Sequence, residues 1–201
     1  MTLKFECLDA GGLLIADQSF FSNPHQDDEV EYVFSIALDL EGNTNIICDF
    51  EEDEDWDNIW HRETLFLVDK INNHEFSFVT LPVGDFNLTL SDILLEHDEN
   101  VFYSDSLIQV LSEKVLIFEA SHWAECTGTR KLQSLHDMSL ENGCYRVQIQ
   151  IDDNIKCQAH DNSEDTDLVG NILISITKAE TINLTPLLEI PCYQRWHSMS
   201  L

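Results

Sequence analysis

Short runs of β-branched and aromatic residues recur along the whole chain, separated by glycine, asparagine and aspartate. Runs of this kind are typical of an all-β sandwich or barrel. The clearest run has Tyr145, Val147, Ile149 and Ile151 alternating with polar side chains, which predicts a strand with one buried and one solvated face. Strands are predicted over residues 3–8, 13–21, 30–38, 45–48, 64–69, 75–79, 87–90, 106–111, 115–120, 145–151 and 171–178.

Helical periodicity is weak throughout the chain. Residues 131–138 are predicted to form a turn or two of helix, and residues 185–190 another. Neither segment is long enough to organise the fold, because a short isolated helix is marginal in water. The expected fold class is therefore an all-β sandwich with few short helices.

The two halves of the chain resemble each other, which suggests an internal repeat. The turn and strand at residues 81–90 reappear loosely at residues 140–149, where Asn142-Gly143 is a typical hairpin dipeptide. We therefore expect two tandem antiparallel β modules. The first spans residues 1–112, and the second spans residues 113–201 and ends in a short tail. The alternative is a single β-sandwich domain over residues 1–201.

Net charge narrows the classes of partner. The chain has 38 acidic and 10 basic side chains, which gives a formal charge of −28. Phosphate binding requires clustered lysine and arginine, so nucleic acids and anionic membranes are excluded as expected partners. A strongly negative surface instead favours a basic protein and steers it into contact.

The densest acidic stretch is residues 49–57, where only Phe50 and Trp56 interrupt the carboxylates. Such a stretch must face water, a metal or a cationic partner. A solvated loop is the simplest interpretation, but exposed indoles are costly in water and are enriched as interface anchors. The candidate partner-binding residues are Asp49, Glu51, Glu52, Asp53, Glu54, Asp55, Trp56, Asp57 and Trp60.

The cysteines and the hydropathy pattern indicate a cytoplasmic protein. The six cysteines are scattered without a C-x-x-C pair, and no signal peptide precedes the first predicted strand, so we expect reduced thiols. No apolar run approaches the roughly eighteen residues that a membrane-spanning helix needs.

Sequence motifs for catalysis or cofactor binding are absent, including the P-loop, the dinucleotide-binding glycine motif and the nucleophile elbow. The eight histidines are spread singly, without the spacing of a zinc protease. We therefore expect no enzyme activity and no cofactor.

Two weak metal-binding patterns are left as minor alternatives. Asp161, Ser163, Asp165 and Asp167 alternate oxygen ligands as a calcium loop does, but Thr166 and Ile172 replace the glycine and glutamate of an EF-hand. A looser Ca²⁺ site in this loop stays open. Zinc is disfavoured because its candidate ligands lack the turns of a zinc knuckle. Those ligands are His122 with Cys126, and Cys157 with His160.

Several of these features together resemble the competence protein J family of small bacterial β-proteins. They are the early Gln-Ser-Phe-Phe at residues 18–21, the acidic Trp56-Asp57, the Leu-Pro-x-Gly-Asp-Phe turn at residues 81–86 and an apolar last strand. The match covers residues 13–111 and, more faintly, residues 115–178. That family includes an inhibitor of a DNA-entry nuclease and relatives that resemble immunity proteins. The resemblance implies a β-sandwich that binds and blocks a protein, with no catalytic residues.

The expected function is therefore that of an acidic bacterial inhibitor or immunity protein. It would block a basic protein, such as a nuclease toxin or a nucleic-acid-binding protein, by presenting carboxylates as phosphate mimics. One alternative is a DNA mimic that acts on restriction or defence proteins with charge spread over its whole surface. An alternative of another class is a Ca²⁺-binding adhesion or lipid-binding β-sandwich module.

Overall fold

The computed structural model describes residues 2–7, 12–22, 65–81, 84–98, 101–119, 134–152, 169–179, 183–188 and 190–191. Within these residues the chain forms mainly strands, with one 3-10 helix and one α-helix. In chain order the elements are β1 (Thr2–Cys7), β2 (Gly12–Asp17), η1 (Gln18–Ser22), α3 (Leu65–Asn72), β3 (Phe76–Thr80), β4 (Gly84–Ser91), β5 (Phe102–Val110), β6 (Lys114–Glu119), β7 (His136–Ser139), β8 (Gly143–Asp152) and β9 (Val169–Lys178).

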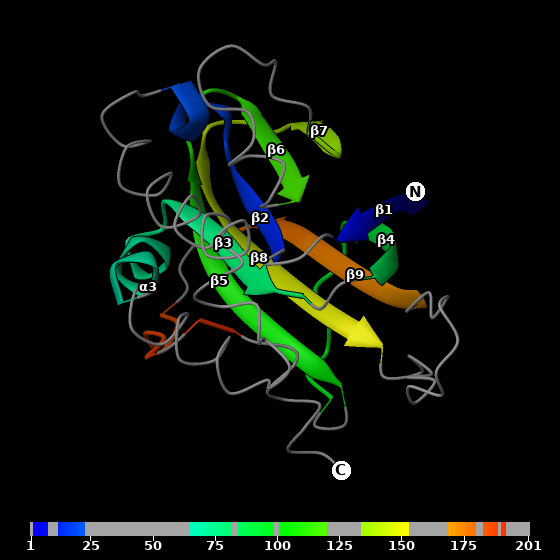
Figure 1. Cartoon of the computed structure of the whole chain (residues 1–201). Coiled ribbons are helices and arrows are strands. Elements are labelled where there is room, and N and C mark those ends of the chain that lie inside the picture. The colour runs from blue at the N-terminus through cyan, green and yellow to red at the C-terminus, as the bar shows by residue number, and fades with distance from the viewer. Residues whose placement is uncertain are drawn as a thin grey trace, which may run out of the picture.

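The strands form two sheets that pack face to face. Sheet A has the order β1-β4-β9-β8-β5, and sheet B has the order β3-β2-β6-β7. Figure 1 shows β3 of sheet B lying over β5 and β8 of sheet A, with α3 beside β3. The predicted all-β sandwich with few helices is therefore confirmed.

Strands from both sides of residue 112 share each sheet. In sheet A, β4 and β5 pair with β9 and β8, and in sheet B, β2 pairs with β6. The expected boundary at residue 112 thus does not separate the described strands, which form one sandwich with one core between its sheets. The pairing is also not purely antiparallel, because β4 and β9 run parallel in the middle of sheet A.

The main core lies between the two sheets. The apolar face predicted for β8 is confirmed, since Tyr145, Val147, Ile149 and Ile151 are all buried in this core; the opposite face is only partly solvated, because Gln148 is buried as well. Facing side chains of sheet B include Leu13, Ile15, Val79, Val115 and Ile117. At its start, β2 approaches β3 so closely that a Cβ on Gly12 would lie 2.6 Å from the Val79 carbonyl oxygen, which explains the glycine there.

A second apolar cluster covers the outer face of sheet B. It joins side chains of β2, β3 and β6 to Val68 and Ile71 of α3 and to Ile190 near the C-terminus. The predicted strand over residues 64–69 is wrong, because residues 65–72 form α3. Val68 and Ile71 are three residues apart, so a helix places both on the face that contacts the sheet.

Three other local predictions are wrong. Residues 136–139 form the edge strand β7, and residues 185–188 are not helical. Asn142-Gly143 does not make a hairpin, because β7 belongs to sheet B and β8 to sheet A. The dipeptide instead lies in the connection from β7 in sheet B to β8 in sheet A, where Gly143 has φ = 153°. Few L-residues adopt that conformation, which accounts for the glycine.

Asp17, at the end of β2, holds the crossing from β5 to β6. Its Oδ2 accepts hydrogen bonds of 2.9 Å from the amides of Leu111 and Ser112 and from the Ser112 hydroxyl, while Oδ1 accepts from the amide and the hydroxyl of Ser19. Asp17 is only 2% exposed, and burial taken alone would raise the pKa of its carboxyl group. The hydrogen bonds from Ser19, Ser112 and Leu111 outweigh the burial and hold the pKa below its ordinary value.

Candidate partner-binding surface

The predicted partner-binding residues between Asp49 and Trp60 lie outside the described residues, so the structure places none of them. The same is true of the candidate calcium loop at residues 161–167 and of both candidate zinc pairs. Among the residues that the structure does describe, no group of three His, Cys, Asp or Glu side chains could hold a metal ion. Helices long and apolar enough to cross a membrane are likewise absent from the described ranges.

Cations of the described surface are largely neutralised by local ion pairs. Of the five lysine and arginine residues in the described ranges, four lie within ion-pair distance of a carboxylate. Most of these pairs are part-exposed and contribute little to stability, but they leave few cations to offset the other carboxylates. The pairs are Lys70–Glu75, Lys114–Asp137, Arg146–Asp105 and Lys178–Glu141.

The connection between β4 and β5 combines carboxylates with exposed apolar side chains. We call residues 92–98 the acidic segment, because Asp92, Glu96 and Asp98 lie in it and are exposed. Between them, Ile93 is 71% exposed and Leu94 is 52% exposed. Two adjacent large aliphatic side chains in water, rimmed by charge, have the composition of a small protein-binding patch.

Glutamine side chains of β8 hold the acidic segment against the outer face of sheet A. Gln148 is buried, and its Oε1 accepts a 2.9 Å hydrogen bond from the Leu95 amide while its Nε2 donates to the Leu95 carbonyl. Gln150 Nε2 donates to the carbonyl of Glu96. Upstream, the amide of Ile93 donates to Ser91 Oγ at 3.2 Å. The segment is thus fixed at several points, which lowers the conformational entropy that binding would cost.

A polar network beneath the acidic segment fixes its orientation further. The Nε of Arg146 donates to both carboxylate oxygens of Asp105, at 2.9 and 3.1 Å, and the Tyr103 hydroxyl donates to Asp105 Oδ2 at 3.0 Å. Gln148 Nε2 donates to the Tyr103 hydroxyl, and the ring of His97 packs edge-on against Tyr103 with centroids 4.9 Å apart. These contacts tie the segment to β5 and β8 together.

The electrostatics of this network follow from its burial and charge. The hydrogen bond to Asp105 and the charge of that residue raise the pKa of Arg146, so the guanidinium stays charged. Burial raises the pKa of Tyr103, and the Asp105 carboxylate adds to the increase. The phenol therefore stays neutral and acts as a hydrogen-bond donor at physiological pH.

Sequence reasoning missed the acidic segment. It is less dense in charge than residues 49–57, and its sequence Asp-Ile-Leu-Leu-Glu does not reveal which of the three aliphatic side chains is exposed. The signal that was available is the short acidic loop after the strand at residues 87–90. Only the structure shows that Leu95 is turned partly inward while Ile93 and Leu94 face solvent.

Comparisons with known proteins leave the family open. No family model matches the chain, and no curated protein matches it. Among solved structures, a chain described as "Crocagin biosynthetic gene J" is 13% identical with a TM-score of 0.41, over 87% of this chain and 96% of that one. A likeness at this level carries no functional argument. The resemblance to the competence protein J family therefore stays a prediction.

Proposed function

We propose that this protein is an acidic inhibitor or immunity protein that binds and blocks a basic protein of the nuclease or nucleic-acid-binding class. It acts in the cytoplasm by binding and carries out no reaction of its own. Its carboxylates occupy positions on the partner that otherwise hold phosphate, through charge-assisted hydrogen bonds. The proposal rests on one observation above others: exposed apolar side chains sit among the carboxylates of a segment that sheet A holds in place.

The carboxylates and the exposed apolar side chains contribute to binding in different ways. Carboxylates steer the basic partner and set the association rate, which falls as salt screens the charges. Ile93 and Leu94 provide apolar contact that charge does not supply, and their loss acts on the dissociation rate. Residues Asp53, Glu54 and Asp55 belong to the steering charge, with Trp56 as a second anchor.

The test uses a partner captured from the host at low salt, identified by mass spectrometry, then purified and measured by kinetics on a sensor surface. Ile93→Ser with Leu94→Ser should raise the dissociation rate about ten- to a hundredfold. Neutralising residues 53–55 to their amides should slow association and flatten its salt dependence. The matched control is Asp69→Asn, which removes one exposed carboxylate from α3.

Each alternative function predicts another result. A DNA mimic with charge spread over the whole surface would show small, similar effects for all of these variants, Asp69→Asn included. A Ca²⁺-binding module would give heat and a rise in melting temperature on titration with millimolar Ca²⁺. Unchanged kinetics in both the aliphatic and the carboxylate variants would refute the proposal.

A further inference from the structure

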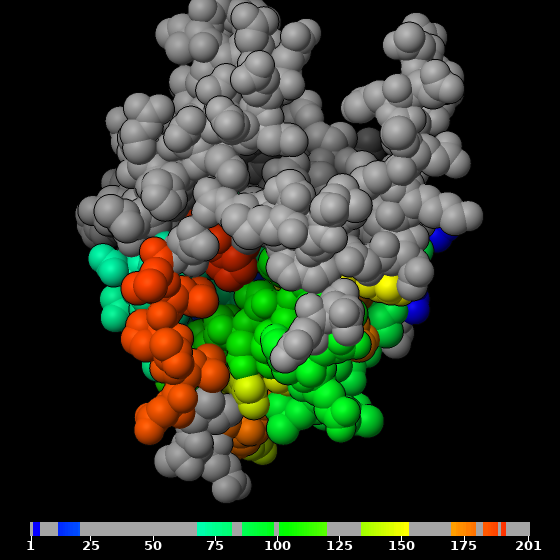
Figure 2. All heavy atoms as spheres, turned by 90° about the horizontal axis from the view of Figure 1, so that it is seen from below, coloured from blue at the N-terminus to red at the C-terminus, as the bar shows by residue number. Residues whose placement is uncertain are grey.

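A segment near the C-terminus lies beside β5 and α3 (Figure 2). We call residues 183–188 the strap. Asn72, the last residue of α3, bonds the backbone of Leu187 twice: its Oδ1 accepts from the Leu187 amide at 2.9 Å and its Nδ2 donates to the Leu187 carbonyl at 3.0 Å. Just beyond the strap, the Thr80 amide donates to the Pro191 carbonyl and Ile190 is buried in the second apolar cluster. Figure 2 shows the strap lying against the atoms of β5 and α3.

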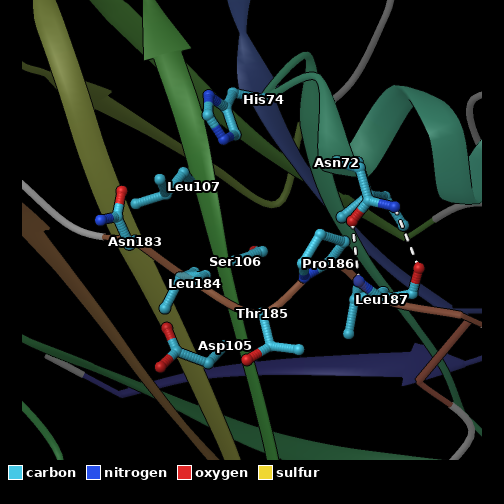
Figure 3. A pocket seen from close by; sticks show the side chains of 11 residues that line it. Asn72, His74, Asp105, Ser106, Leu107, Asn183, Leu184, Thr185, Pro186 and Leu187 are labelled. Carbon is cyan, nitrogen blue, oxygen red and sulfur yellow. Dashed lines mark hydrogen bonds between the residues drawn. The ribbon is translucent and has the colours of Figure 1, made fainter.

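The strap does not fill the space beneath it. A hollow of about 170 Å³ lies there, lined by α3, β5 and the strap (Figure 3). Its apolar lining includes Ile71, Leu107 and Leu184, and its polar lining includes His74 and Asn183. The hollow is therefore amphipathic, with aliphatic carbon and hydrogen-bonding groups around one small volume.

One buried hydroxyl in the lining has no partner. Ser106 on β5 lines the hollow, is 4% exposed, and its Oγ makes no hydrogen bond. Three other buried hydroxyls in the described residues are also unpartnered, but Ser77, Thr80 and Ser175 do not border the hollow. A buried hydroxyl left unpaired is unfavourable, so a group that bonded Ser106 from inside the hollow would gain affinity.

Charge in the lining indicates an uncharged ligand. Asp105 also borders the hollow, but Arg146 already neutralises its carboxylate through hydrogen bonds to both oxygens. No lysine or arginine is among the described lining residues. Neither an anion nor a cation would therefore find an uncompensated opposite charge there.

Size limits the ligand further. An engineered apolar cavity of about 150 Å³ in another protein binds benzene, so this hollow has room for a molecule of about six to eight heavy atoms. We infer that the hollow beneath the strap is a binding site for a small neutral molecule with an apolar body and one hydroxyl or carboxamide group. The polar group pairs with Ser106, and the body packs against the aliphatic side chains. This site is independent of the proposed inhibitor function.

The test titrates the full-length, ¹⁵N-labelled protein with phenol and follows its amide resonances. Phenol should shift the amides of residues 105–107 and 183–187 saturably, with a dissociation constant of about 1 mM or tighter. Ser106→Ala should weaken binding about two- to tenfold, the fold-change of one neutral hydrogen bond. That variant removes a hydroxyl without orphaning a partner, so it should fold normally. Benzene should bind about as weakly to the natural protein as phenol does to the variant.

A variant in which a larger side chain fills the hollow distinguishes binding at this site from general association of phenol with apolar surface. Leu184→Trp adds bulk within the strap where it lines the hollow and should abolish the phenol shifts. Leu188→Trp is the matched control, because Leu188 lies in the same strap but is 88% exposed and does not line the hollow. Shifts that do not saturate, or that persist in Leu184→Trp, would overturn the inference and leave a hollow that holds water only. Benzoate binding as tightly as phenol would overturn the assignment of a neutral ligand.

Discussion

Replacing Asp17 by asparagine should destabilise the sandwich at the point where β2 meets the crossing from β5 to β6. The carboxylate accepts five hydrogen bonds, three of them at Oδ2. An asparagine keeps the shape but presents an NH₂ group to donors at one of the two positions, which leaves at least two donors without an acceptor. At about 1–3 kcal/mol for each orphaned group, partly relieved by relaxation, we expect a loss of about 2–4 kcal/mol in unfolding free energy at pH 7.

The pKa of Asp17 determines how the stability difference between the two proteins changes with pH. The folded state lowers the pKa of Asp17, so the ionised carboxylate stabilises the fold. That contribution is complete well above the unfolded pKa of about 3.9, and it is lost as the pH falls through the lower folded value. Urea unfolding of both proteins should thus show a difference that is constant from pH 8 to about pH 5 and shrinks below it.

The control for Asp17 is Asp137→Asn. Hydrogen bonds from Lys114 and Ser134 lower the pKa of Asp137, but its side chain is 46% exposed, so a change of about 0–1 kcal/mol is expected. The reasoning about Asp17 is refuted if Asp17→Asn costs no more than this control. It is also refuted if the Asp17 difference stays constant down to the lowest pH at which both proteins remain folded.

Three further predictions concern the strap, a thiol and the net charge. Asn72→Ala removes both hydrogen bonds to Leu187 and should lower the unfolding free energy, measured in urea, by about 1–3 kcal/mol. Amide exchange at Leu187 should also become faster. The control Asn73→Ala, at an exposed neighbouring residue, should lower the unfolding free energy by less than about 0.5 kcal/mol. Burial raises the pKa of the free Cys144 thiol, so mass spectrometry should find it alkylated more slowly at pH 8 in the folded chain than in urea. Added salt should raise the melting temperature by screening the charge of −28, by about 2–4 °C for each 1 kcal/mol gained; an unchanged or lower value would contradict this.

Much of the sandwich could be predicted from the alternation of apolar and polar residues, because a strand that buries one face has an apolar residue at every second position. Strand β8 is the clearest case, and β3, β6 and β9 lie close to their predicted ranges. The run Leu65-Phe66-Leu67-Val68 is different, since a continuous apolar stretch fits a buried strand or a helix equally well. The helix forms because Val68 and Ile71 pack on the outer face of sheet B, a contact that local sequence does not encode.

Contacts between distant residues were not predictable in the same way. Asp17 bonds residues 111 and 112, and Asn72 bonds residue 187, and neither side chain differs in sequence from an ordinary surface Asp or Asn. The strap is not helical because Pro186 lacks an amide proton and restricts Thr185 before it. The hollow and the exposed side chains of the acidic segment also depend on such contacts, so the sequence alone indicated a negative surface but not these places on it.

The parallel pairing of β4 with β9 has a consequence for synthesis in the cell. β4 emerges from the ribosome early, yet its neighbour on one side begins only at residue 169. Until β9 has been made, this edge of β4 has no partner strand and sheet A is incomplete. Unpaired strand edges of this kind can pair with the wrong strand or with another chain. Sheet A therefore cannot be completed until β9 has been synthesised, and the strong negative charge of the nascent chain would help to keep it from aggregating in the meantime.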